Sequence, residues 1–130
     1  MSSGVRSARG TAARLAGRRA EAFAAALLML KGYRILGFRL KTRQAEIDVL
    51  ALRGKVLAVV EVKRRTSLLA ALETVTWDQR ERLRRAGAAI AAGRPQLADA
   101  SVRLDLIALA PGKLPRHIPD AWKGDRLGAS

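Results

Sequence analysis

The chain of 130 residues has room for one domain with one hydrophobic core, and 49% of its residues are hydrophobic. It has no cysteine and a single histidine, which excludes disulfides, thiolate metal sites and a zinc site built from several imidazoles. The formal net charge of +14 favours a polyanionic partner, nucleic acid first of all, although a composition that only keeps the protein soluble gives the same charge.

The predicted elements follow the chain in the order helix, three strands, helix, strand. Residues 1–10 are small, polar and basic, and we interpret them as a flexible basic leader. The periodic segments predict a helix over residues 11–30, strands over 33–40, 46–52 and 56–62, a helix over 77–92 and a strand over 102–109. They predict one α/β domain over residues 11–122, with a mixed central sheet flanked by helices, and a C-terminal tail over 123–130.

The second and third predicted strands form a β-hairpin with a tight turn. If the loop consists of Gly54 and the lysine after it, counting outward places Asp48 opposite Glu61 and Glu46 opposite Lys63. All four charged side chains then share one face of the hairpin. A three-residue loop breaks this alignment, so the inference depends on a loop with an even number of residues.

A pair of carboxylates on facing strands is unfavourable unless a proton or a cation lies between them. Asp48 and Glu61 would supply hard oxygen ligands for Mg²⁺ or Mn²⁺, with water and a substrate phosphate completing the octahedron. Such an ion suits phosphodiester hydrolysis, and Lys63 could orient the attacking water or stabilise the developing charge. A surface cluster of weak cross-strand ion pairs fits the spacing about equally well.

Two strings of residues resemble a nuclease signature. AEIDVLAL, followed after a short turn by VVEVKRR, resembles the D-(x)n-E-x-K motif of the PD-(D/E)xK nucleases. The likeness extends to the YraN-like bacterial family at Ala20-Glu21, Gly32-Tyr33, Arg103-Leu104-Asp105 and His117-Ile118. The resemblance implies a restriction-endonuclease-like core of order αβββαβ, similar to archaeal Holliday-junction resolvases. It also implies metal-dependent hydrolysis of DNA by a structure-selective endonuclease that acts on branched or damaged DNA.

The resemblance gives roles to further residues. Glu21 matches an acid that other members place on the first helix as an additional metal ligand or water contact, although an ordinary surface glutamate fits equally. Glu46 belongs to the Glu-Ile-Asp triplet and would position Lys63. Gln79 stands where relatives tend to have lysine, while other nucleases use a helical glutamine to support the site. Asp105 is expected to pair with a nearby arginine rather than with a metal.

Basic residues beside the predicted site are expected to contact phosphates without reading sequence, namely Arg64, Arg65, Arg80, Arg82, Arg84 and Arg85. The expected partner is nucleic acid, DNA ahead of RNA, and a homodimer is a further expectation by analogy with the resolvases. The longest apolar run is too short to cross a bilayer, so we expect no membrane partner and a cytoplasmic location. The alternative function is a non-catalytic nucleic-acid-binding module that keeps the nuclease fold.

Overall fold

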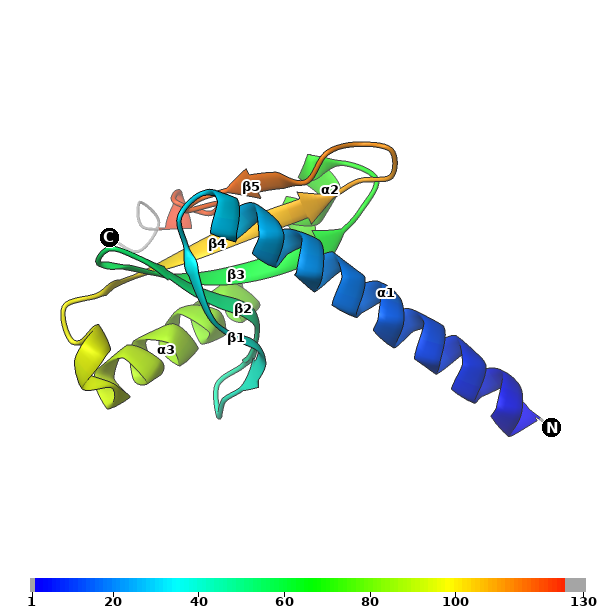
Figure 1. Cartoon of the computed structure of the whole chain (residues 1–130), viewed down its shortest axis with the longest axis horizontal. Coiled ribbons are helices and arrows are strands. Elements are labelled where there is room, and N and C mark those ends of the chain that lie inside the picture. Colours follow the sequence, from blue (N-terminus) through cyan, green and yellow to red (C-terminus); the bar gives the residue numbers. More distant parts are fainter. Residues whose placement is uncertain (1, 126–130) are drawn as a thin grey trace.

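A five-stranded mixed sheet forms the centre of the protein, which a computed structural model describes over residues 2–125 (Figure 1). The strands lie in the order β1-β2-β3-β4-β5, with the bounds Arg34–Lys41, Glu46–Arg53, Val56–Arg64, Ser101–Leu109 and Arg116–Ile118. β3 and β4 are parallel, and the other neighbouring pairs are antiparallel. The predicted α/β class with a mixed sheet is confirmed, and the architecture is consistent with a restriction-endonuclease-like core.

Helices cover both faces of the sheet. Val60 belongs to the hydrophobic cluster under α1 (Ser2–Leu30), whereas Val59 belongs to the cluster under α3 (Trp77–Gly93). Because successive side chains of a strand point to opposite faces, a strand between two helical layers needs apolar residues at every position. The run VLAVV at the start of β3 meets this requirement, and its last four residues are fully buried.

The first helix is longer than its predicted form. α1 begins at Ser2 instead of residue 11, so it includes residues that the sequence suggests as a leader. No proline interrupts this stretch, and its alanine and arginine residues favour a helix. The N-terminal half of α1 projects beyond the sheet in Figure 1. At the other end, residues 126–130 of the predicted tail lie outside the described residues.

Three short elements were not predicted: α2 (Leu68–Thr74), a 3₁₀ turn (Pro95–Leu97) and β5. The side chain of Ser67 caps α2 by accepting a hydrogen bond of 3.1 Å from the backbone N–H of Ala70. Such elements are shorter than the windows in which hydrophobic periodicity can be recognised. No helix in the described part of the chain combines the length and the apolar character needed to span a bilayer.

Candidate active site

β2 and β3 form the predicted hairpin with a loop of two residues, and this loop sets the register of the site. Gly54 has a φ of +59°, the left-handed conformation that a tight hairpin turn needs. The pairing runs from the loop to Val49 opposite Val60 without a bulge. The next position along this register belongs to Asp48 and Glu61, as the sequence predicts.

At this position β3 is hydrogen-bonded to the side chain of Asp48 and not to its backbone. Its Oδ2 accepts a hydrogen bond of 2.9 Å from the backbone N–H of Val62. The carboxyl groups of Asp48 and Glu61 lie close enough for each to shift the pKa of the other. Asp48 is half-buried, and Glu61 exposes 10% of its side chain. The hairpin therefore brings two carboxyl groups close together at a place that water reaches poorly.

Burial and mutual repulsion shift the pKa values of this pair. Burial, and after it the charge of Asp48, raises the pKa of Glu61 from its ordinary value of 4.5 to about 8. Lys63 opposes this increase, since its Nζ lies 3.6 Å from Oε2 of Glu61. Burial also raises the pKa of Asp48, although the Val62 N–H and Lys63 favour its ionised form. One lysine does not balance two carboxylates here, so the pair needs a proton or a further cation.

The paired positions of β2 and β3 end at Val49 and Val60, so the expected position of Glu46 opposite Lys63 lies beyond this ladder and stays a prediction. Lys63 forms an ion pair with Glu61. Glu46 lies exposed at the start of β2, where its neighbour on the other side is Lys41 of β1.

A small pocket of about 240 Å³ adjoins the carboxyl pair on the α3 side, and its lining includes Glu46, Glu61, Gln79 and Arg82. Gln79 thus lies where a supporting residue is expected. Its Oε1 accepts a hydrogen bond of 2.8 Å from the backbone N–H of Thr76, as part of the capping box that begins α3. Arg82, one of the arginines expected to contact phosphates, is exposed at this pocket.

Glu21 approaches the pair from α1, where it forms an ion pair with Arg39 of β1. Burial raises the pKa of Glu21, Arg39 lowers it, and Asp48 and Glu46 raise it further, so these carboxylates interact. Within residues 2–125, however, no three histidine, cysteine or acidic side chains converge closely enough to hold a metal ion. Glu21 therefore lies near the pair without completing a site of three carboxylates. Arg39 was not predicted.

Two arginines that are expected to contact phosphates form ion pairs within the protein. Arg80 donates to both carboxylate oxygens of Asp125 at 2.7 and 2.8 Å, and Arg84 approaches the same group at 2.8 Å. Arg80 first, and Arg84 after it, hold the pKa of Asp125 below its usual value. Arg80 and Arg84 therefore hold the C-terminal segment against α3, and their expected contact with phosphates stays a prediction. The other arginines expected to contact phosphates are exposed, namely Arg64, Arg65, Arg82 and Arg85.

Asp105 lies outside the site, fully buried on β4. It accepts hydrogen bonds from Arg103, at 2.8 Å to each carboxylate oxygen, and from the backbone N–H of Asp120 at 2.9 Å. His117 of β5 hydrogen-bonds to it at 2.8 Å. The expected pairing of Asp105 with an arginine is confirmed, and the group joins β5 and the segment after it to the sheet.

Comparison with known proteins identifies the family. Residues 20–109, which include Glu21, Asp48, Glu61 and Lys63, match the family model described as "Uncharacterised protein family UPF0102". A UPF0102 protein of Caulobacter vibrioides (strain NA1000 / CB15N) is 66% identical over 124 residues, 95% of this chain and 99% of the relative. A UPF0102 protein of Caulobacter sp. (strain K31) is 72% identical over 115 residues, 88% of this chain and 83% of the relative. One of Paramagnetospirillum magneticum is 49% identical over 118 residues, 88% of this chain and 92% of the relative. The chain therefore belongs to the UPF0102 family, the YraN-like family that its motifs resemble.

Proposed function

We propose that this protein is a metal-dependent endonuclease of the PD-(D/E)xK type that hydrolyses DNA, with Asp48, Glu61 and Lys63 as its catalytic residues. The closeness of the two carboxyl groups carries the proposal. In a surface cluster of ion pairs, each carboxylate would lie in solvent beside its own cation. Here two carboxyl groups with little access to water lie close together, and Lys63 is the cation that favours the ionised form of both. This arrangement is costly in a structural role and useful for binding a cation.

The donor set fits Mg²⁺ or Mn²⁺. Asp48 and Glu61 would hold the ion, since it would relieve their repulsion and prefers carboxylate oxygens. Mg²⁺ is usually held by one or two carboxylates together with water and substrate phosphate, so a third protein carboxylate is not required. When bound, such an ion supplies a polarised phosphodiester and a water of lowered pKa.

The surrounding residues have defined tasks in this proposal. The Val62 N–H fixes the orientation of Asp48, as partners of metal ligands commonly do. Lys63 places its ammonium group beside Glu61, where it can stabilise negative charge that develops on the phosphate. No helix in the described part of the chain carries a base-reading code, so the substrate is selected by the structure of the DNA, such as a branch or a damaged site. A cytoplasmic homodimer that presents two such sites to one branch belongs to the same proposal.

The test is a cleavage assay on labelled single-stranded, duplex, flap and four-way-junction DNA with Mg²⁺, Mn²⁺ or EDTA. Asp48→Asn and Lys63→Ala should each lower metal-dependent cleavage by roughly 10²-fold or more, because each removes a charge that acts in the transition state. Asp99→Asn, at an exposed carboxylate before β4, should retain full activity. Cleavage that persists in pure Asp48→Asn protein would overturn the proposal. DNA binding without hydrolysis in either metal would favour the non-catalytic binding module.

A further inference from the structure

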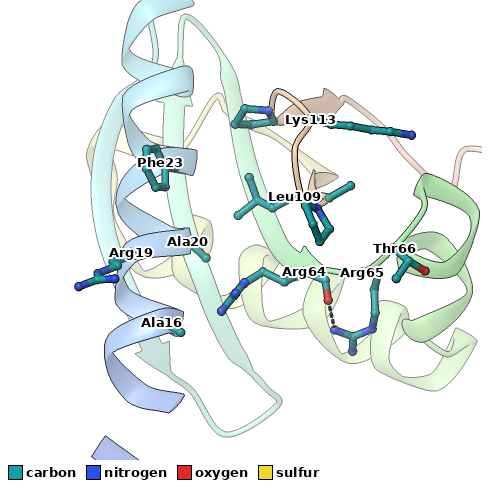
Figure 2. A pocket seen from close by; sticks show the side chains of 12 residues that line it. Ala16, Arg19, Ala20, Phe23, Arg64, Arg65, Thr66, Leu109 and Lys113 are labelled. Carbon is teal, nitrogen blue, oxygen red and sulfur yellow. Dashed lines mark hydrogen bonds between the residues drawn. The ribbon is translucent and has the colours of Figure 1, made fainter. Parts of the chain in front are cut away.

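A groove of about 860 Å³ lies between α1 and the C-terminal ends of β3 and β4 (Figure 2). Its volume falls within the range of about 300–1,000 Å³ that is usual for ligand pockets. Among the described residues that line it, none is acidic and four are cationic: Arg19, Arg64, Arg65 and Lys113. Figure 2 shows Arg64 reaching from the end of β3 toward α1. The charge of the groove therefore favours an anionic occupant.

An aromatic ring lies exposed among these cations. Phe23 leaves 62% of its surface exposed, and it lines the groove together with Ala16 and Ala20 at helical spacing on the same face of α1. Leu109 and two prolines add further apolar surface. A flat aromatic surface beside phosphate-binding cations is the combination that proteins use to bind single-stranded nucleic acid.

The two other occupants that an apolar groove could attract fit less well. A second copy of this chain would bring two such sets of cations together, on molecules that each carry a formal net charge of +14. Duplex DNA would offer phosphates to the cations but no free base face to Phe23, because its base faces are stacked inside the helix. An unpaired strand offers both a phosphate and a free base face.

We propose that this groove binds an unpaired strand of nucleic acid, with a base stacked on Phe23 and phosphates beside Arg64 and Lys113. Of these cations, neither Arg64 nor Lys113 forms a side-chain ion pair with any residue in the part of the chain that the structure describes. Both are therefore available to phosphates.

The groove and the candidate active site share two elements. On α1, Arg19 and Ala20 line the groove and are followed by Glu21; on β3, Lys63 is followed by Arg64. Because successive side chains of a strand point to opposite faces, Arg64 lies on the α1 face of the sheet and Lys63 on the α3 face. An unpaired segment in the groove would therefore pass the C-terminal end of β3 to bring a phosphodiester to the carboxyl pair. In this respect the inference rests on the proposed function, and it names the substrate class as DNA with a single-stranded segment beside a branch.

Fluorescence anisotropy with a labelled oligothymidylate, in EDTA so that nothing is cleaved, tests the binding step. Phe23→Ala should weaken binding of this strand roughly tenfold, because a stacking platform is lost. The matched control is Met29→Ala, which truncates another exposed side chain of α1 outside the groove and should leave binding unchanged. Since both side chains are largely exposed, neither truncation removes much packing, and circular dichroism checks the fold.

The salt dependence of binding separates phosphate contacts from stacking. Lys113→Gln and Arg64→Gln should each reduce the slope of log affinity against log salt by about 0.7, whereas Phe23→Ala should leave the slope unchanged. Lys55→Gln is the matched control and should have no effect, because Lys55 lies in the hairpin loop at the opposite end of β3 from Arg64.

Three outcomes would overturn the inference. These are equal effects of Phe23→Ala and Met29→Ala, equal affinity for a duplex of the same length, and a dimer in sedimentation that Phe23→Ala dissociates while strand binding persists. Failure of the proposed function is distinguishable from these results. If the protein binds the strand through Phe23 but hydrolyses no DNA, the groove is supported and only the proposed nuclease activity is overturned. If Phe23→Ala leaves cleavage unaffected, the nuclease activity is supported and only the role of the groove is overturned.

Discussion

At the residue scale, the raised pKa of Glu61 makes the stability of the protein depend on pH. Burial and the adjacent Asp48 raise its pKa to about 8, so the folded protein retains a proton that the unfolded chain releases near 4.5. The contribution of Glu61 to the free energy of unfolding is therefore most favourable below about pH 4.5 and is lost as the pH rises to about 8. Above that pH, the folded protein keeps two ionised carboxylates together unless a cation neutralises them.

Replacing Glu61 by glutamine should remove this pH dependence in the absence of metal. Thermal melts in EDTA between about pH 5 and pH 9 should show Glu61→Gln gaining stability relative to wild type as the pH rises, because the amide does not ionise. Mg²⁺ at the upper pH should raise the melting temperature of wild type more than that of the variant. The exposed Glu73→Gln serves as control. Parallel curves for wild type and Glu61→Gln would contradict the expectation.

The sequence was sufficient to predict that Asp48 and Glu61 lie close together, because a two-residue loop fixes the register of a hairpin. It was not sufficient to predict the partner of Lys63. The Asp48 side chain accepts the N–H of Val62 and so ends the ladder, and a hydrogen bond between side chain and backbone leaves no trace in a pattern of alternation. Phe23 was missed because its surroundings come from segments far apart in the chain.

At the scale of elements, α3 approaches the sheet at a glycine. A Cβ added to Gly87 would lie 2.6 Å from Cγ2 of Val59 and 2.8 Å from Cγ1 of Val102. β-Branched side chains have little rotamer freedom with which to retreat. This close approach sets the position of α3, and with it that of Gln79 and Arg82 beside the carboxyl pair.

Gly87→Ala should destabilise the protein by about 1–3 kcal/mol in urea denaturation, because the overpacking outweighs the gain in helix propensity. Gly93→Ala is the matched control in the same helix, since a Cβ there meets nothing within 4 Å, and it should cause no loss. If Gly87→Ala were as stable as wild type, α3 would not be held by this contact.

The long periodic elements were predictable and the short ones were not. The strands over 46–52 and 56–62 contain enough aliphatic residues to be recognised from the sequence. Their observed bounds differ by at most two residues from the predicted ones. β5 has three residues between two prolines and pairs with β4 where His117 meets Asp105. A strand that forms because of such a tertiary contact has no signal of its own in the sequence.

At the scale of the whole molecule, the formal net charge of +14 causes repulsion within the folded state. Raising NaCl from about 0.05 to about 0.5 M screens this repulsion and should increase the melting temperature by a few degrees, on the order of 1 kcal/mol of stability. KCl of the same concentration should act equally, because the effect depends on ionic strength. A decrease in melting temperature would mean that ion pairs such as Arg80–Asp125 outweigh the net repulsion.

The segment of residues 110–115, which connects β4 with β5, forms one wall of the groove. It belongs to no strand, includes Gly112 with a φ of +71°, and follows the residues 20–109 that match the family model. Asp48 and Glu61, in contrast, stand on strands with neighbours on both sides. Insertions or exchanges in this connection would alter the groove without moving the carboxylates of Asp48 and Glu61. Under the proposed function, substrate selection and chemistry could therefore evolve independently on this scaffold.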